Sequence, residues 1–377
     1  MAADDEHPLT AVDRPAFESG EHTLRLADLF CGCGGLTLGV AQAARTFDVG
    51  LDVALAVDFD KVATKTYSLN FPKATVRKTK IQTLFKATLG AELNEGEQQI
   101  REDVGEIQAL VGGPPCQGHS DLNNHTRRDD PKNAFYKRMA RAAEVLNPTV
   151  VMVENVPTVR HDKGGVVDIV TDHLQHLGYA VADAVIKLED LGVAQRRRRH
   201  ILLAVRDDVA VPEVVLKSAV TGHDGPYDVK WAIGDLEDRD PDGILDTPPK
   251  ASVDNLARME WLLKNNKYNL PNELRPRCHR DKTHSYNAMY GRLKWTDPAQ
   301  TITSGYGSIG QGRYMHPSLT RALTPHEAAR LQGFPDYFKF HDAAKRAELA
   351  TMIGNAVPPA LSAAVFSVLM PSLVDLD

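Results

Sequence analysis

The sequence predicts an α/β protein with a mostly parallel, doubly wound sheet and a smaller, irregular second domain. Two patterns support this. Short β-branched apolar runs alternate with helix-spaced runs in the first half of the chain, and that alternation ends near Val205. The strand-like runs are TLRLADLF (23–30), VALAVDF (53–59), IQALVGG (107–113) and TVVMVENV (149–156). The helix-like runs are KVATKTYSLNF (61–71), AFYKRMARAAEVL (134–146) and VVDIVTDHLQHLG (166–178). This order is typical of βαβ units, which join parallel strands.

The composition bounds the class of protein. A chain of 377 residues with 42% hydrophobic and 25% charged residues can bury a large core and fill about two domains. Four cysteines in such a length do not indicate a disulfide framework, so a reducing cytosol is expected. Cys31 and Cys33 lack a second cysteine or histidine pair at zinc spacing, and no metal is expected. We see no signal peptide and no long apolar run, and therefore expect no membrane partner.

Charge is distributed unevenly along the chain. The net charge of -6 does not by itself indicate a nucleic-acid-binding protein. Residues 1–20 are acidic and lack apolar periodicity, which predicts a loose tail. Basic residues gather in QRRRRH (195–200), in RPRCHRDK (275–282) and at Arg127 with Arg128. Such clusters are usually solvated faces, and each is also a candidate for phosphate contact.

The domain boundaries follow from these patterns. We expect the first domain over 21–205 and the irregular domain, rich in proline, glycine and polar residues, over 206–345. Residues 346–377 contain PPALSAAVFSVLMPSL (358–373), whose apolar positions mark one face of a helix. That helix is expected to return to the first domain.

A glycine loop, DLFCGCGGLTLG (28–39), directly follows the first predicted strand. Glycines at this place let the backbone approach a ligand and direct helix N-terminal amides toward it. The spacing differs from G-x-G-x-x-G and lacks the lysine of a phosphate loop, so a tight turn without a ligand remains the alternative. At the end of the second strand, Asp58 is placed to accept hydrogen bonds from a ribose and Phe59 to stack on a base. Together these features predict an adenosine-containing cofactor.

Three further elements are expected at or near the carboxyl ends of strands, where open α/β sheets bind ligands. Cys116 follows two prolines at the tip of a strand in VGGPPCQGHS (111–120). Glu154 lies in an apolar strand, where a carboxylate is costly to bury unless it is paired; a structural ion pair with an arginine is the alternative. QRRRRH adds a cationic clamp. A nucleophile, an acid and a cation together favour addition to an electron-poor ring.

With these motifs, the chain closely resembles the cytosine-5 DNA methyltransferases of the bacterial modification-methylase type. The matching motifs occur in the family's order and cover most of the chain: DLFCGCGGLTLG, GGPPCQGHS, ENV, QRRRRH, RALTPHEAARLQGFPDYF and IGNAVPP. The resemblance implies the S-adenosylmethionine-dependent methyltransferase fold, with the irregular domain as a target-recognition domain. It also implies methyl transfer to C5 of a flipped cytosine in double-stranded DNA.

The resemblance assigns roles to individual residues. Cys116 would add to cytosine C6 as a thiolate, Glu154 would bind N3 and the exocyclic amine, and Arg199 would hold O2. Arg197 would orient its neighbours, and Gln117 and Ser120 would lie in a loop that closes over the base. The implied cofactor residues are Phe30, Gly32, Cys33, Gly34, Gly35, Leu36, Asp58, Phe59, Ile81, Pro115, Phe135, Asn355 and Val357.

The chain departs from the family pattern at several positions. His119 replaces the usual phenylalanine, and Phe135 stands where leucine is common. Lys80 precedes Ile81 where an acidic residue often meets the adenine amine, so that contact stays unassigned. Residues 86–103 look like an insertion.

The DNA contacts implied by the basic clusters are Arg127, Arg128, Gln195, Arg275, Arg277, Arg280 and Arg292. The target sequence cannot be read from one chain. Two alternatives are a transfer-RNA cytosine-5 methyltransferase, whose expected Cys-Phe-Thr element is missing, and a silent DNA-binding regulator, which would have lost a chemical residue. We expect a monomer in the nucleoid-containing cytoplasm, and the resemblance leaves room for a cognate restriction endonuclease.

Overall fold

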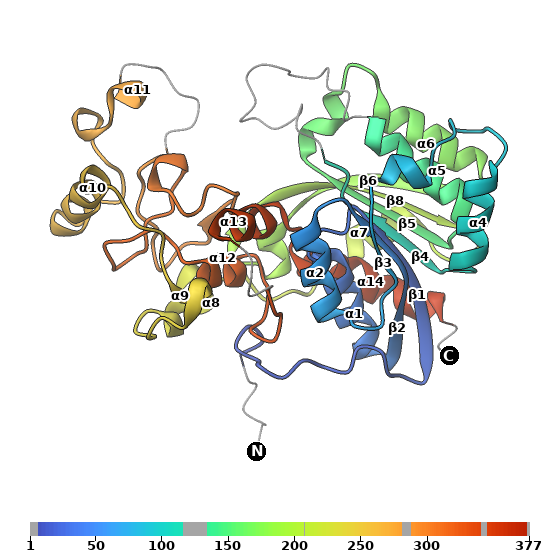
Figure 1. The fold of residues 1–377 in the computed structure, drawn as a ribbon, viewed down its shortest axis with the longest axis horizontal. Helices are drawn as coiled ribbons and strands as arrows, with labels where there is room; N and C mark the ends of the chain where they lie inside the picture. Colours follow the sequence, from blue (N-terminus) through green and yellow to red (C-terminus); the bar gives the residue numbers. More distant parts are fainter. Residues whose placement is uncertain (1–6, 116–133, 207, 281–287, 341–344, 375–377) are drawn as a thin grey trace. The chain divides into compact units, whose positions relative to one another are not determined.

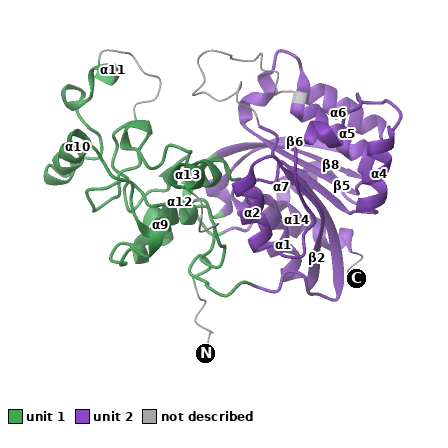
Figure 2. Ribbon diagram, viewed as in Figure 1, with its two compact units in different colours: residues 1–14, 192–197, 224–356 green, residues 15–191, 198–223, 357–377 purple. Residues whose placement is uncertain are grey.

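The computed structural model describes residues 7–115, 134–206, 208–280, 288–340 and 345–374. The chain divides into two compact units (Figure 2). Unit 1 comprises Met1–Arg14, Gly192–Arg197 and Asp224–Ala356, and unit 2 comprises Pro15–Leu191, Arg198–His223 and Val357–Asp377.

Unit 2 contains a seven-stranded sheet in the order β3-β2-β1-β4-β5-β8-β6 (Figure 1). The strands from β3 to β5 are parallel, whereas β8 runs antiparallel to both β5 and β6. The predicted mostly parallel sheet is therefore confirmed. The bounds are β1 His22–Leu29, β2 Val49–Asp58, β3 Val76–Lys78, β4 Ala109–Gly112, β5 Val150–Asn155, β6 Tyr179–Lys187 and β8 Arg198–Arg206.

Helices cover both faces of this sheet. Figure 1 shows α4, α5 and α6 over one face and α1, α7 and α14 over the other. Their bounds, with those of the shorter helices of unit 2, are α1 Gly35–Thr46, α2 Lys61–Asn70, α3 Ile81–Leu84, α4 Glu95–Val104, α5 Ala134–Leu146, η3 Pro157–His161, α6 Val166–His176, η4 Leu188–Leu191, α7 Pro212–Ser218 and α14 Pro359–Leu373.

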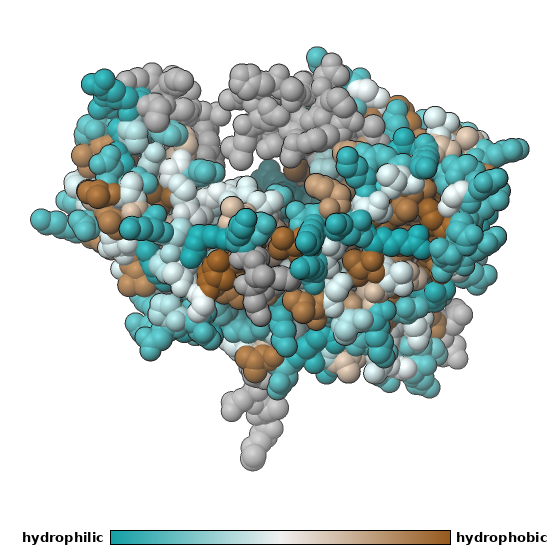
Figure 3. Space-filling model, in the orientation of Figure 1, coloured by the Kyte–Doolittle hydropathy of each residue, from teal (hydrophilic) through white to brown (hydrophobic). Residues whose placement is uncertain are grey.

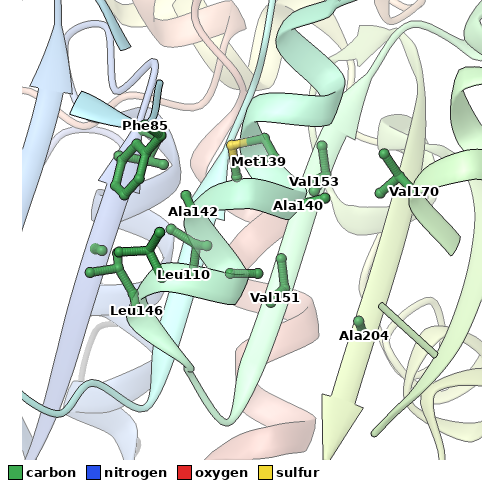
Figure 4. Packing of buried hydrophobic residues seen from close by; sticks show 14 of the residues in the cluster. Phe85, Leu110, Met139, Ala140, Ala142, Leu146, Val151, Val153, Val170 and Ala204 are labelled. Carbon is green, nitrogen blue, oxygen red and sulfur yellow. The ribbon is translucent and has the colours of Figure 1, made fainter. Parts of the chain in front are cut away.

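The main apolar core lies between the sheet and α5. In Figure 4, Met139 and Ala142 of α5 lie close to Leu110 of β4 and Val151 of β5, and all four are buried. Burying such side chains stabilises the fold by about 25 cal/mol per Å² of apolar surface removed from water. The carboxyl ends of β4 and β5 lie beyond this core and are free to carry polar groups.

Residues 86–103, expected as an insertion, include helix α4, which a buried ion pair ties to α5. Arg141 Nη2 lies 2.6 Å from Glu97 Oε2, and both side chains are fully buried. Arg141 also donates to the carbonyls of Ala91 and Glu92. Because a buried ion pair needs its remaining hydrogen-bonding groups satisfied, these carbonyl contacts complete the arrangement.

The C-terminal helix α14 packs on α1, as its apolar face predicts. Ser362 Oγ donates to the carbonyl of Leu36 at 2.7 Å, and Leu361, Val365 and Leu369 are buried. By length and composition alone, the stretch Arg346–Leu373 could cross a membrane, which the sequence analysis overlooked. The burial of α14 against α1 instead marks it as a core helix. On the face drawn in Figure 3, hydrophobic residues are scattered among hydrophilic ones.

Unit 1 is irregular, as expected, and its described part contains a single pair of parallel strands, β7 Gln195–Arg196 and β9 Ala299–Gln300. An ionic cluster joins its segments, because both ring nitrogens of His326 lie 2.7 Å from carboxylate oxygens of Asp246 and Asp336. The helices are α8 Val229–Ile233, η5 Gly234–Leu236, α9 Gly243–Asp246, α10 Val253–Lys264, η6 Asn272–Leu274, α11 Arg277–Arg280, η7 Ile309–Gln311, α12 Pro325–Leu331 and α13 Arg346–Asn355.

Two expectations about boundaries differ from these units. The start of QRRRRH pairs with β9, so Gly192–Arg197 packs in unit 1, and so does α13. The described part of the expected loose tail, residues 7–20, is anchored by buried Leu9 and Phe17. In unit 1 the amide of Asp336 also donates to the carbonyl of Leu9.

Candidate active site

The loop between β1 and α1 has the backbone conformation of a ligand cradle. Phe30, Gly32 and Gly34 have φ angles of 57°, 52° and 102°. Gly34 is the N-cap of α1, and a Cβ there would lie 2.7 Å from the ring of Phe71, so only glycine fits. A Cβ on Gly32 would meet nothing within 4 Å. The loop therefore leaves open space beside the first amides of a twelve-residue helix.

Asp58 closes this cradle at the end of β2. Its Oδ2 accepts the amide of Gly32 at 3.0 Å, and its Oδ1 accepts the amide of Asp60 at 2.8 Å. Burial raises the pKa of Asp58, while these backbone hydrogen bonds act in the opposite direction. Each carboxylate oxygen keeps a lone pair for a further donor. Phe59 is 67% exposed, which makes its ring available for stacking.

The other predicted cofactor residues of unit 2 lie around the same sheet edge. The rings of Phe30 and Phe135 are 5.7 Å apart. Ile81 begins α3, and Gly35 and Leu36 begin α1; all three are buried. Pro115 is the last described residue before the Cys116 loop.

The glycine loop also contains two buried thiols. Burial raises the pKa of the Cys33 thiol to about 12 and that of Cys31 well above its usual value. A thiol that stays protonated is a poor nucleophile. Neither thiol is therefore suited to act as the attacking nucleophile.

Glu154 and Arg199 form a close ion pair at the sheet edge. Arg199 Nε lies 2.6 Å from Glu154 Oε1, and the two side chains are 13% and 9% exposed. Burial lowers the pKa of Arg199, and the carboxylate of Glu154 opposes that shift. The pairing is the arrangement that the sequence analysis weighed as a structural alternative, and it also holds the carboxylate in a fixed orientation.

Arg199 lies at the predicted sheet edge, although it reaches that edge differently from Glu154. It does not follow the carboxyl end of a strand but lies near the beginning of β8. Because β8 is antiparallel to β5, with Asn155 opposite His200, its beginning meets the carboxyl end of β5. Glu154 and Arg199 thus reach the same edge from opposite chain directions.

The beginning of the cysteine loop lies next to Glu154. A Cβ on Gly113 would be 3.0 Å from Glu154 Oε2 and 3.6 Å from Val357 Cγ2. Asn155 Nδ2 donates to the carbonyl of Pro114 at 3.3 Å. Sequence reasoning missed Asn155, although a second polar residue at the end of an apolar strand is a usable signal. The predicted residues Cys116, Gln117, Ser120, Arg127 and Arg128 lie outside the described residues.

In unit 1, Gln195 and Arg197 are both buried. Gln195 was expected to contact DNA, but its amide is used inside unit 1 and that expectation is withdrawn. Arg197 donates to the carbonyls of Ile302 and Ala356. Asn355 ends α13 and is exposed, whereas Val357 belongs to unit 2.

Of the six arginines expected at the DNA interface, the four in unit 1 fall into two pairs. Arg275 Nε donates to the carbonyl of Leu270, and Arg292 Nε donates to the carbonyl of Pro317. These contacts engage both guanidinium groups within unit 1. Arg277 and Arg280 lie on α11 and are exposed.

Comparison with known proteins shows the family of this chain. The family model described as C-5 cytosine-specific DNA methylase matches residues 24–370. The chain belongs to this family. The enzyme is accordingly a DNA cytosine-5 methyltransferase that uses S-adenosylmethionine. Its glycine cradle, helix N-terminus and Asp58 carboxylate suit the amino-acid and ribose parts of that cofactor.

Individual relatives extend the comparison. The type II methyltransferase M1.BsuMI of Bacillus subtilis is 43% identical over 358 residues, covering 95% of this chain and 83% of that protein. The type II methylase M.HgiDII of Herpetosiphon aurantiacus is 30% identical, covering 89% of this chain and 91% of that protein. The Schizosaccharomyces pombe Dnmt2 methyltransferase shares the fold, with a TM-score of 0.60 at 16% identity over 92% of this chain and 98% of that one.

Among the described residues, no group of three or more histidine, cysteine, aspartate or glutamate side chains is placed to bind a metal ion.

Proposed function

We propose that the enzyme methylates C5 of a cytosine flipped out of a specific duplex sequence, through a covalent bond between Cys116 Sγ and C6. The observation that carries this proposal is the Glu154–Arg199 pair beside Gly113, three residues before Cys116. A thiol that follows Gly113 by three residues in the sequence, together with an acid beside Gly113, suits attack on a pyrimidine ring.

The reaction begins with nucleophilic addition. Cytosine C5 is a poor nucleophile until the Cys116 thiolate adds to C6 and gives the ring enamine character. S-adenosylmethionine, when bound, would supply the electrophilic methyl group to C5, with S-adenosylhomocysteine as the leaving group. Loss of the C5 proton to water or hydroxide restores the C5–C6 double bond and expels the thiolate.

Glu154 and Arg199 stabilise the charge that develops in the ring. Arg199 engages Oε1, and Oε2 faces the Gly113 side. This leaves Glu154 Oε2 to hold a proton at cytosine N3 while Arg199 binds O2. The target base must leave the duplex to reach them, at a cost of a few kcal/mol.

The decisive experiment incubates the protein with labelled S-adenosylmethionine and either duplex DNA or transfer RNA, and then maps modified cytosines by sequencing. We expect methylation at C5 within one short duplex motif. Methylation of transfer RNA alone, or of neither substrate, would overturn the proposal.

The biological setting is part of the same proposal. The type II names of the relatives at 43% and 30% identity support modification of a specific sequence, in partnership with a cognate endonuclease. We infer that the enzyme acts as a monomer on nucleoid DNA in the cytoplasm. We assign unit 2, which contains most of residues 21–205 and the C-terminal helix, to catalysis, and the irregular region within 206–345 to target recognition.

Asp58→Ala should weaken cofactor binding by about 10- to 100-fold, because each hydrogen bond to a charged group contributes ~1.5–3 kcal/mol. Calorimetric titration with S-adenosylmethionine measures the change. Asp52→Ala, on the same strand and paired with Arg25, is the control and should bind normally. Unchanged affinity in the Asp58 variant would remove the ribose assignment.

Substitutions in α11 should change which DNA sequence is recognised without changing the chemical step. Arg277→Ala or Arg280→Ala should cost about 1–3 kcal/mol and relax the target at one position if the arginine reads a base. A phosphate contact would instead weaken binding on all sequences and flatten its salt dependence. We expect at least one of the two to read a base, and methylome sequencing of a host expressing each variant is the measurement.

Lys264→Ala, exposed on α10, is the control for general loss of positive charge. Arg275 and Arg292 are engaged within unit 1, so their substitution is expected to disturb folding first. If the motif and its stringency stay unchanged in both α11 variants, the base-reading role is wrong.

A further inference from the structure

We propose that Gln332, Gln195 and Arg197 form a positioning hub. Their hydrogen bonds fix the two points at which the chain passes out of unit 1. The hub thereby positions the residues next to those points, which we assign to cofactor and cytosine binding. The inference rests on the proposed function for the roles of Asn355, Val357 and Arg199. None of the comparisons assigns a role to Gln332.

The hub is built on a buried pair of amides. Gln195 and Gln332 are fully buried in unit 1. Gln195 Nε2 donates to the carbonyl of Leu331 at 3.0 Å and to Gln332 Oε1 at 2.8 Å, and its Oε1 accepts the amide of Ile302 at 2.9 Å. Gln332 Nε2 donates to the carbonyls of Ile353 at 2.6 Å and Ala356 at 3.5 Å. A buried polar network satisfied in this way holds its members in one arrangement.

Arg197 adds a second clamp to the same segments. Its Nη1 donates to the carbonyl of Ile302 at 2.9 Å, and its Nη2 donates to that of Ala356 at 3.2 Å. Ile302 is therefore held at both its amide and its carbonyl. The carbonyl of Ala356 receives donors from both Arg197 and Gln332.

The clamped residues are the ones at which the chain changes units. Unit 1 ends one segment at Arg197 and another at Ala356, and unit 2 resumes at Arg198 and Val357. Arg199, which pairs with Glu154, comes two residues after the first crossing. Asn355 and Val357 lie on either side of Ala356, the residue at which unit 1 ends for the second time.

Close packing further restricts the chain at the second point where it passes out of unit 1. A Cβ on Gly354 would lie 2.1 Å from the amide nitrogen of Ser304, so the residue before Asn355 must be glycine. The end of α13 is thus pressed against the segment that begins at Ile302. Displacing one crossing should therefore displace the other, since the same three side chains hold both.

A purely structural role is the alternative, and a stability-matched comparison separates the two. Gln332→Met keeps the volume and removes every hydrogen bond of the side chain. The control is Leu262→Ala in the core of α10, which is buried in unit 1 and away from the hub. The full-length variants are compared by melting temperature, calorimetric affinity for S-adenosylmethionine, and kcat and KM on duplex DNA.

At a temperature where both variants are folded, Gln332→Met should lower cofactor affinity by about tenfold, within the range that network residues modulate. Its kcat should fall by about 100-fold, since small misplacements of reacting groups have effects of that size. Leu262→Ala should keep both values near those of the wild type. Equal losses in the two variants, or an unchanged Gln332→Met, would overturn the proposal.

Gln332→Glu serves as a second variant if the methionine variant does not fold. Its carboxylate can still accept from Gln195 but no longer donates to Ile353 and Ala356. Cofactor affinity should then fall while the KM for DNA stays closer to normal, and an unchanged cofactor affinity would contradict the hub. Because cofactor affinity is read without DNA, failure of the hub remains distinguishable from a wild type that does not methylate DNA.

Discussion

Cys116→Ser should abolish methylation while leaving cofactor affinity close to that of the wild type. A serine hydroxyl is far less ionised than a thiol at neutral pH and adds poorly to C6. Cys31 and Cys33 are not expected to take over, because both are buried and burial raises the pKa of both thiols. Methyl transfer to duplex DNA and calorimetric cofactor binding are measured on the same preparation.

Cys278→Ser is the matched control, since Cys278 lies in the proposed recognition region and should be dispensable for chemistry. Turnover in Cys116→Ser near that of Cys278→Ser would show that no thiolate at position 116 is required.

Glu154→Gln should slow methyl transfer by about 100- to 10,000-fold, the range typical of general acid catalysis. Glutamine keeps the shape of the side chain but cannot supply the proton that the ring needs at N3. Single-turnover measurement of methyl transfer isolates the chemical step from product release.

The substitution also leaves Arg199 without its carboxylate partner, so loss of stability must be separated from loss of chemistry. Glu97→Gln provides the control, because Glu97 pairs with buried Arg141 at the same distance of 2.6 Å. Both variants should unfold more easily, since each removes the charge of one carboxylate from a buried ion pair, although Arg141 keeps its second ion pair with Glu144 at 2.8 Å. If the folded Glu97 variant is slowed as much as the Glu154 variant, Glu154 has no specific role in the reaction.

Much of the sheet could be predicted because its parallel strands are short, apolar and separated by amphipathic helices. The predicted runs at 53–59 and 149–156 fall within one residue of the carboxyl ends of β2 and β5. Strands β6 and β8 were missed. β8 begins inside the arginine run, whose charge masks its apolar continuation, and no local pattern indicates that it runs antiparallel.

Glu154, the proposed catalytic acid, was identifiable as a candidate because a glutamate in an apolar strand is costly to bury unless it has a function or a partner. Gln195 was misjudged because its neighbours are arginines. Gln195 and Arg197 are buried, whereas Arg196 and Arg198 are exposed, an alternation with a period of two that indicates an extended segment. The pairing of Gln195 with Gln332 joins residues far apart in sequence, so no local pattern could reveal it.

The most direct test of the covalent mechanism uses a duplex that carries 5-fluorocytosine at the mapped target. After addition of Cys116 and methyl transfer there is no C5 proton to remove, so the adduct cannot resolve. With S-adenosylmethionine present, the wild type should form a complex that survives denaturation, and Cys116→Ser should form none. A wild type that methylates the normal duplex but yields no denaturation-resistant complex with the fluorinated one would contradict covalent catalysis through Cys116.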